Sequence, residues 1–279
     1  MNAPESATRL ILQVRWGPQS FQKMSLLPGQ TLQVGRDETA GMKILKDELM
    51  SPLHFELNWD GRTCQIRDMK SALGTWLGGK PVLDAEVPHG GWVRAGRTDF
   101  SVYRERETLT LAAADSDEQT AAKERALTLL SQQGPPLFAV LDAARDERIL
   151  VLLRESIDEC RSLYEGSKGD AMEEIAPYLV RFSKESNLLA ALVKEGWGRS
   201  WGIYLTCTQT FVEVRRHLRK FLMVEAEGMD DSLYFRYYDP RVLSTFLATS
   251  TEDQLRDFQG LLMQFLFEDE DSGFRNFLR

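Results

Sequence analysis

The stretch VRRHLRKFLMVEAEGMDDSLYFRYYDPRVLSTFL, residues 214–247, changes its periodicity twice. Its first residues place apolar side chains at helical spacing among arginine and lysine, which predicts a helix. Alternation on either side of Gly228 then predicts two strands, over 222–227 and 233–238, with a turn between them. Asp239-Pro240 has the residue types of a helix N-cap and first helical position. The stretch therefore predicts a helix, a hairpin and a second helix, with arginine and tyrosine crowded at the end of the hairpin.

Two segments of this stretch resemble the signature of the bacterial type VI secretion effector adaptors. They are His217-Leu218-Arg219-Lys220 and the run from Phe235 to Leu243. Three upstream segments also resemble that family and occur in the right order: Pro136 to Ala144, Glu195 to Gly198, and Trp201 to Ile203. The resemblance covers roughly the second half of the chain. It implies a cytoplasmic adaptor-chaperone that binds a toxic effector stoichiometrically and helps load it onto the VgrG spike protein.

Composition excludes several other classes of protein. The formal net charge of -8 argues against a nucleic-acid binder. The three cysteines, Cys64, Cys160 and Cys207, are far apart and odd in number, which indicates reduced thiols in the cytosol. The first residues do not read as a secretory signal, and no apolar run approaches the ~20 residues that span a bilayer. The sequence therefore predicts a soluble, cytoplasmic bacterial protein without membrane insertion.

Residues 1–108 have the pattern of an all-β sandwich. Short alternating runs are separated by turn residues such as Pro28-Gly29 and Asp60-Gly61, and no long amphipathic helix interrupts them. The clearest runs are Leu10 to Val14, Thr31 to Val34, His54 to Leu57, Thr63 to Ile66, Trp92-Val93 and Phe100 to Tyr103.

Three segments of this region resemble the forkhead-associated (FHA) domain, a family that binds phosphothreonine peptides on loops at one end of its sandwich. They are Gly35-Arg36, Ser51 to His54 and Asp68 to Thr75. Arg36 and Ser51 match the two phosphate-contacting positions of the family, and a dianionic phosphate favours a guanidinium and a hydroxyl donor. His54 matches a residue that more often braces the loop.

The same segments depart from the family at two positions. Pro52 stands where Arg, Lys or Asn is usual, and Leu73 stands where an Asn amide usually grips the peptide backbone. Each lost polar contact costs on the order of 1 kcal/mol. Two hypotheses remain open: an FHA fold kept as a protein-docking module, or a working reader of a phosphothreonine protein.

The second half of the chain predicts a linker and then an α/β domain. Residues 109–134 read as a partly helical linker, and 135–279 as the adaptor domain, with an α/β lobe over about 135–239 and a helical lobe over about 240–279. The expected strands are 137–141, an edge strand at 174–180 because Pro177 cannot donate to a ladder, and 201–207. The expected helices are 146–155, 186–195 stopped by Gly196, and one from a capping box at Thr251 with an apolar stripe to Phe265.

Arginine and aromatic residues supply the candidate binding surface, because tyrosine and arginine dominate interface hot spots. The candidates for binding effector or spike are Trp197, Trp201, Arg216, Tyr234, Arg236, Tyr238 and Arg241. The alternatives are that the tryptophans belong to the core and that the arginines pair internally with Asp239, Glu213 and Glu225. The end from Phe274 to Leu278 reads as a docking tail or a frayed terminus.

Catalytic signatures are missing from the sequence. His54, His89 and His217 have no partners at metal-ligand spacing, and neither a G-x-S-x-G nor a P-loop pattern occurs. No catalytic residue, metal or cofactor is therefore predicted. The main rival is a phosphothreonine-reading signalling scaffold that regulates the secretion system. A more remote alternative is a small-molecule enzyme that uses the Trp/Arg/Tyr cluster.

Overall fold

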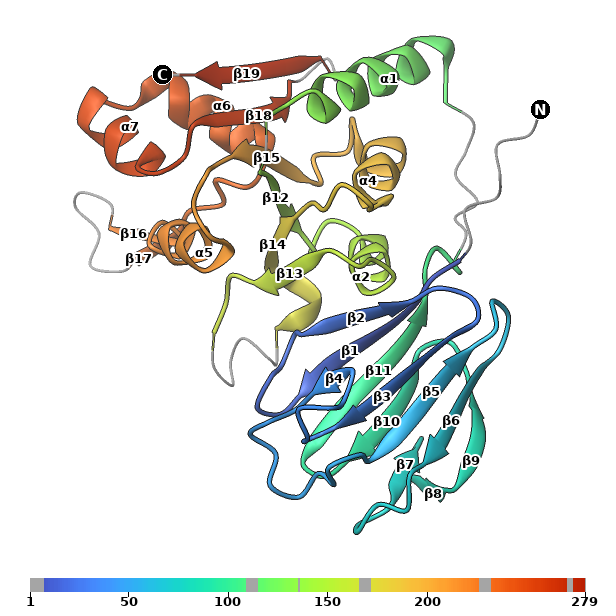
Figure 1. Cartoon of the computed structure of the whole chain (residues 1–279). Helices are drawn as coiled ribbons and strands as arrows, with labels where there is room; N and C mark the ends of the chain where they lie inside the picture. The colour runs from blue at the N-terminus through green and yellow to red at the C-terminus, as the bar shows by residue number, and fades with distance from the viewer. Residues whose placement is uncertain are drawn as a thin grey trace. The chain divides into compact units, whose positions relative to one another are not determined.

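The computed structural model describes residues 8–108, 115–134, 136–165, 172–225, 232–269 and 273–278. The chain divides into two compact units (Figure 1). The first contains Met1–Leu109 together with Arg154–Glu159, and the second contains Thr110–Leu153 and Cys160–Arg279.

The first unit is the all-β sandwich that the sequence predicts. Its strands are β1 (Leu10–Trp16), β2 (Lys23–Leu26), β3 (Gln30–Gly35), β4 (Met42–Lys43), β5 (Phe55–Trp59), β6 (Cys64–Asp68), β7 (Thr75–Leu77), β8 (Lys80–Val82), β9 (Asp84–Val87), β10 (Gly91–Ala95) and β11 (Thr98–Arg104). One sheet has the order β2-β1-β11-β10-β7-β8 and the other β4-β3-β5-β6-β9. Strand alternation builds the core between them: Phe55, Leu57 and Trp59 of β5 are buried, and the residues between them are not.

A short segment from much later in the chain also belongs to the first unit. Lys23 donates from Nζ to the carbonyl oxygens of Ser156, at 2.8 Å, and Asp158, at 3.0 Å. The Thr108 hydroxyl donates to the Glu155 carboxylate at 2.5 Å. No local pattern in the sequence indicates these contacts.

The second unit has an α/β architecture, as predicted. Its main sheet consists of β12 (Leu137–Asp142), β13 (Glu159–Ser162), β14 (Pro177–Arg181), β15 (Gly202–Thr206), β18 (Gln264–Glu268) and β19 (Phe274–Leu278), in the order β13-β14-β12-β15-β18-β19. The helices are α1 (Asp117–Ser131), α2 (Glu147–Arg154), α4 (Leu188–Gly196), α5 (Phe211–Arg219), α6 (Pro240–Thr249) and α7 (Glu252–Gln259), with a 3-10 turn η1 (Glu173–Ile175).

Helices cover both faces of this sheet (Figure 1). Helices α1, α2 and α4 pack on the face that carries Ala139 and Leu141 of β12. Helices α5, α6 and α7 pack on the face that carries Phe138 and Val140. Successive residues of the central strand therefore enter two separate cores, which is why β12 reads as an unbroken apolar run.

Strand β14 corrects the prediction of an edge strand. It lies between β13 and β12 in the sheet. Pro177 is its first residue, and its carbonyl oxygen accepts from the Leu163 amide at 2.8 Å. A proline at the start of a strand needs no N–H partner there, so it is compatible with an internal position.

The predicted helical C-terminal lobe is only partly helical. The capping box at Thr251 is confirmed, but α7 ends at Gln259, and Gly260 follows with φ 49°. Phe265, expected on the helix, lies in β18. The Phe274–Leu278 end pairs with β18 as strand β19, so it is neither a docking tail nor frayed. Two helices and then two strands form this part of the unit.

Helix α1 lies inside the region interpreted as a linker, but it belongs to the second unit. Its Ala126 and Leu130 are buried in the core beneath α2 and α4. Its start is fixed by a capping box between Ser116 and Gln119 that the sequence interpretation missed. Residues 109–114 of the predicted linker lie outside the described part of the chain.

The stretch at 214–247 forms the predicted order of elements with shorter strands. The hairpin is β16 (Met223–Glu225) and β17 (Ser232–Tyr234), so the second strand ends four residues earlier than expected. Tyr237 and Tyr238 are both buried. The predicted turn at 227–231 lies outside the described residues. Asp239 caps α6 as predicted and accepts from the Arg241 amide at 3.0 Å.

Candidate interaction sites

The loops at one end of the sandwich are held together by a buried histidine. His54 accepts at Nδ1 from the Ser51 amide, 3.1 Å away, which leaves Nε2 to donate to the Gly74 carbonyl oxygen at 3.1 Å. The ring therefore connects the loop before β5 to the loop before β7. The prediction that His54 braces the loop is consistent with this geometry.

A second set of hydrogen bonds fixes the loop from Asp68 to Thr75. The Ser51 hydroxyl oxygen accepts from the Ala72 amide at 2.9 Å. The Asp68 carboxylate accepts from the hydroxyls of Ser71, at 2.5 Å, and Thr75, at 2.6 Å. Burial alone would raise the pKa of Asp68, but these hydrogen bonds outweigh it and lower the pKa. The carboxylate is therefore ionised and structural.

Residues whose side chains can donate hydrogen bonds to a phosphate lie at this end of the first unit. Arg36 is exposed, and its backbone amide donates to the Ser51 carbonyl oxygen at 3.0 Å, so the two predicted phosphate-contacting residues are neighbours. Lys70 is also exposed, with φ 57°. Leu73, at the position of the missing amide, has 53% of its surface exposed. The neighbouring Arg36 and Ser51 thus retain a guanidinium and a hydroxyl, whereas an exposed apolar side chain replaces the amide.

Glycine is required where β3 enters these loops. A Cβ atom on Gly35 would lie 2.0 Å from the Pro52 carbonyl oxygen. That oxygen accepts from the Asp37 amide at 3.0 Å. The Gly-Arg pair of the motif thus lets the loop of Ser51 approach closely enough to set Arg36 beside it.

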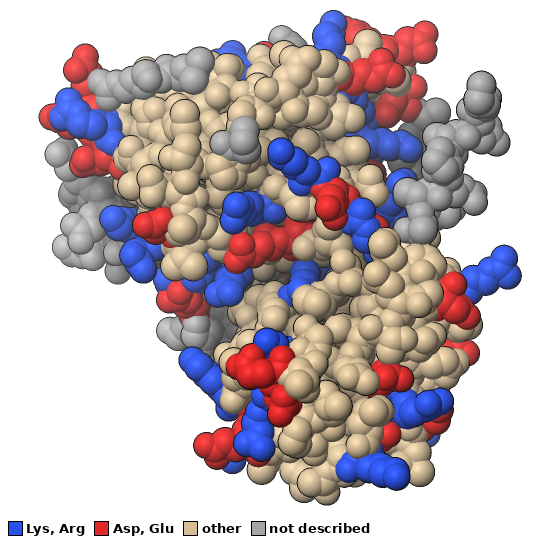
Figure 2. Space-filling model, in the orientation of Figure 1, with Lys and Arg blue, Asp and Glu red and all other residues tan. Residues whose placement is uncertain are grey.

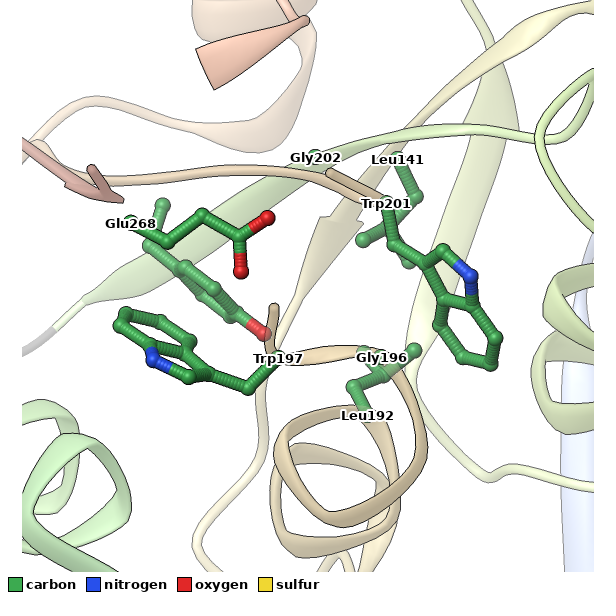
Figure 3. Close-up of a pocket in the computed structure, with 8 residues that line it drawn as sticks. Leu141, Leu192, Gly196, Trp197, Trp201, Gly202 and Glu268 are labelled. Carbon is green, nitrogen blue, oxygen red and sulfur yellow. The ribbon is translucent and has the colours of Figure 1, made fainter. Parts of the chain in front are cut away.

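In the second unit, the carboxylate of Glu268 lies beside Trp197, in the segment from Trp197 to Trp201 that we call the tryptophan-glycine loop (Figure 3). The amides of Gly198 and Ser200 both donate to that carboxylate, and both residues have a positive φ, 86° and 54°. Burial raises the pKa of Glu268, and the two amide hydrogen bonds act in the opposite direction. A carboxylate from β18 is thereby tied to the loop between α4 and β15.

The space beside Glu268 is a small pocket. It measures about 230 Å³ including the open solvent at its mouth, and Leu141, Leu192, Gly196, Trp197, Trp201, Gly202, Tyr204 and Glu268 line it. Trp197 and Trp201 are only 6% and 5% exposed. The prediction that these tryptophans face a partner is therefore wrong, and the alternative that they belong to the core holds.

Three arginines and two buried aspartates alternate at the end of β12 and the start of α6. Arg236 donates to Asp142, and Arg145 donates to Asp239. Arg241 binds Asp239 through Nε at 3.0 Å and Nη2 at 2.7 Å. We call Arg145, Arg236 and Arg241 the arginine group. The Arg241–Asp239 pair agrees with the alternative that these arginines pair internally, whereas Arg236 pairs with Asp142, a partner that the sequence did not indicate.

A tyrosine cluster adjoins the arginine group. The rings of Tyr164 and Tyr234 meet edge to face at 5.9 Å, and the Arg236 guanidinium lies 5.9 Å from the Tyr238 ring. Burial, followed by a hydrogen bond with Tyr234, raises the pKa of Tyr164, so the phenol stays protonated. Tyr234 is 53% exposed but Tyr238 only 2%, which corrects the prediction of a partner-facing Tyr238.

Helix α5 supplies further basic side chains. Arg215 and Arg219 each reach the Glu165 carboxylate at 2.7 Å. Arg216 is exposed, as a candidate binding residue should be. On the face drawn in Figure 2, basic and acidic side chains are interspersed.

Sequence reasoning found only part of this site. It identified Tyr234, Arg236 and Arg241 but missed Asp142, Arg145 and Tyr164. Asp142 ends a buried strand, and a carboxylate at the end of an apolar run is the one signal that could have pointed to it.

No group of three His, Cys, Asp or Glu side chains among the described residues could hold a metal ion. No helix in the described ranges is long and apolar enough to cross a membrane. Cys64, Cys160 and Cys207 are free and buried.

A sandwich with loops of this kind, joined to an α/β unit with a Tyr/Arg surface, defines a protein built from two interaction domains. Residues 32–96 match the model of the FHA domain, and residues 137–257 match the model of a domain of unknown function, DUF4123. The chain thus carries an FHA domain followed by a DUF4123 domain, the family of type VI secretion effector adaptors, and the predicted fusion is confirmed.

Solved FHA domains resemble part of the chain. One from Chlamydia trachomatis is 23% identical, covers 34% of this chain and 96% of its own, and has a TM-score of 0.33. The FhaA FHA domain, solved with the intracellular domain of another protein, is 28% identical, with coverages of 33% and 98% and a TM-score of 0.31. An FHA domain studied for phosphothreonine-dependent interactions is 28% identical, with coverages of 34% and 96% and a TM-score of 0.32. Among curated proteins no match is found.

Proposed function

We propose that this protein is a non-catalytic adaptor-chaperone of the bacterial cytoplasm that binds a type VI secretion effector and helps load it onto the VgrG spike. The second unit would bind the effector or the spike by stoichiometric contact. The FHA domain would act as an additional protein-docking module. The proposal draws on the family of the match at 137–257 and on the surface that the second unit presents.

The observation that carries the proposal is an exposed apolar and aromatic surface on the β16–β17 hairpin. Met223 and Tyr234 are paired across the hairpin, and Leu233 precedes Tyr234. They are 45%, 53% and 42% exposed, respectively. Met223 and Tyr234 share one face of the hairpin, whereas Leu233 lies on the other face, and we call Met223 and Tyr234 the hairpin surface. Large side chains that stay exposed in this way, next to arginine, have the composition of an interface hot spot.

The FHA domain would strengthen the assembly by a second contact. Once one unit has bound its partner, a linked second module meets its own target at a high effective concentration. The presence of an FHA domain supports phosphothreonine peptides as partners. Arg36 and Ser51 are adjacent and supply the donors that such a peptide needs, so we keep a phosphothreonine-reading scaffold as the second candidate function.

Effector secretion by the native bacterium tests the proposed function. A strain that carries Met223→Ser with Tyr234→Ala should secrete at least about tenfold less effector, because hot-spot truncations cost ~2 kcal/mol or more of binding. Met263→Ser is the matched control: Met263 is 53% exposed but lies between α7 and β18. Equal secretion by both variant strains and the wild type would contradict the proposed role of the hairpin surface.

The same strains separate the second candidate. Arg36→Ala should leave effector secretion almost unchanged if the FHA domain is an accessory module. If Arg36→Ala alone stopped secretion, recognition of a phosphorylated partner would be the main function instead.

A further inference from the structure

We propose that the arginine group is a binding site for a carboxylate presented by a protein partner, from an Asp or Glu side chain or from a chain terminus. The proposal deepens the proposed function, on which it rests for the kind of partner.

The site has more hydrogen-bond donors than acceptors. Each guanidinium carries five N–H donors in a planar fork. Arg236 uses one of them on Asp142, and Arg241 uses two on Asp239. The two aspartates also accept backbone amides, from Ala144 at 3.2 Å and Arg241 at 3.0 Å. Backbone amides therefore use part of the acceptor capacity of the two carboxylates. Much of the donor capacity of the arginines remains for an external acceptor.

The charges are arranged so that the positive side faces solvent. The side chains of Asp142 and Asp239 are 1% and 6% exposed, whereas those of Arg236 and Arg241 are 44% and 57% exposed. Three cations meet two carboxylates in a chain whose net charge is -8. Glu268 interacts electrostatically with Asp239, but the amides of the tryptophan-glycine loop hold its carboxylate. The outer edge of the cluster is therefore cationic.

The exposed guanidiniums are held in place before any partner binds. Arg241 is fixed by its two bonds to Asp239, the residue that caps α6, and the N-terminus of that helix adds positive potential. Arg236 is fixed between Asp142 and the buried ring of Tyr238. Groups that are already ordered lose little conformational entropy on binding. A planar fork matches a carboxylate in a bidentate geometry, which favours this ligand class.

Binding of short labelled peptides to the full-length chain tests the proposal. The probes are a Gly/Glu peptide with an amidated end, its Gly/Gln counterpart, and the Gly/Gln peptide with a free terminal carboxylate. Fluorescence anisotropy at constant low salt gives the affinity for each. We expect one or both carboxylate-bearing probes to bind and the amidated Gly/Gln peptide not to bind. Which of the two binds identifies the source of the carboxylate.

Variants then locate the site. Arg236→Gln with Arg241→Gln should weaken binding of the carboxylate probe at least about tenfold, since a hydrogen bond to a charged group contributes ~1.5–3 kcal/mol. Arg62→Gln with Arg97→Gln removes the same charge from exposed positions of the first unit and should leave binding unchanged. If the double variant fails to fold, Arg241→Gln alone replaces it, because this variant leaves Arg145 paired with Asp239. We expect it to weaken binding of the carboxylate probe by a smaller factor.

Two results would overturn the proposal: equal loss of binding in the variants of both units, or unchanged binding in the folded arginine-group variants. Failure of the adaptor function is recognised separately. The wild-type chain could bind the carboxylate probe through the arginine group while the Met223→Ser/Tyr234→Ala strain secretes effector normally. That result would support the anion site and contradict the proposed role of the hairpin surface.

Discussion

Gly196 lies directly against Trp201: a Cβ atom at position 196 would come within 2.2 Å of Cε3 of the indole. Gly196 is the last residue of α4, and it is Gly198, two residues later, that has the positive φ. The helix ends at Gly196 as predicted, but this glycine lacks a positive φ and serves instead to admit the indole that closes the pocket beside Glu268.

Gly196→Ala should destabilise the second unit. The added methyl group must displace a buried ring, which costs about 1–3 kcal/mol, and the better helix propensity of alanine returns at most ~1 kcal/mol of this. Urea unfolding measures the difference. Gly134→Ala is the control, because nothing lies within 4 Å of a Cβ atom there. Equal stability of both variants would mean that Trp201 can move aside.

His54→Ala should destabilise the first unit while Arg36→Ala does not. The imidazole is fully buried and joins the Ser51 amide to the Gly74 carbonyl oxygen. Its loss removes the hydrogen-bond partner of two backbone groups in half-buried residues and leaves a cavity, which we expect to cost about 2–4 kcal/mol. Arg36 is exposed, so its truncation should leave the unfolding midpoint unchanged. A stable His54→Ala variant would show that the loops do not depend on this bridge.

Mild acid should destabilise the second unit through His217. Burial lowers the pKa of His217 below its usual 6.5, against a hydrogen bond from Nε2 to the Phe258 carbonyl oxygen at 2.7 Å. Below about pH 6.5, His217 binds a proton in the unfolded chain, whereas in the folded chain it binds one only at lower pH. Stability is thus fully present above pH 6.5 and falls as the pH drops toward the folded pKa, by at most ~1.4 kcal/mol per pH unit.

The comparison with His217→Gln isolates this group from the carboxylates. Unfolding free energies measured between pH 7.5 and pH 5 should decrease more steeply for the wild type than for the variant. Parallel curves would show that another group causes the acid sensitivity.

Local chemistry explains which elements the sequence predicts correctly. Thr251 and Asp239 identify the starts of two helices in the sequence, because a helix cap is formed by residues within four positions of each other. Arg36 and Ser51 belong to compact motifs for the same reason. The sequence does not reveal the end of α7, because the apolar residues from Leu255 to Phe265 also have the spacing of a helix. Gly260, which has a positive φ, lies against the His217 ring, and the sequence does not show this long-range contact.

Long-range pairing explains the rest. Arg236 and Asp142 are 94 positions apart, and so are Arg145 and Asp239. No periodicity connects residues at such a separation, and only the sheet and the start of α6 bring them together. The surroundings of Trp197 depend on long-range contacts in the same way: its ring stacks on Phe274, and the loop that follows it is tied to Glu268, about 70 positions later.

Recovery of partners from the native cytoplasm tests the central claim most directly. The tagged full-length chain would be purified with its bound proteins, identified by mass spectrometry, for the wild type and for Met223→Ser with Tyr234→Ala. We expect VgrG and one large toxin to accompany the wild type, and at least one of them to be lost from the variant. Recovery of neither protein, together with a phosphothreonine protein that disappears on Arg36→Ala, would contradict the adaptor function and establish a signalling scaffold.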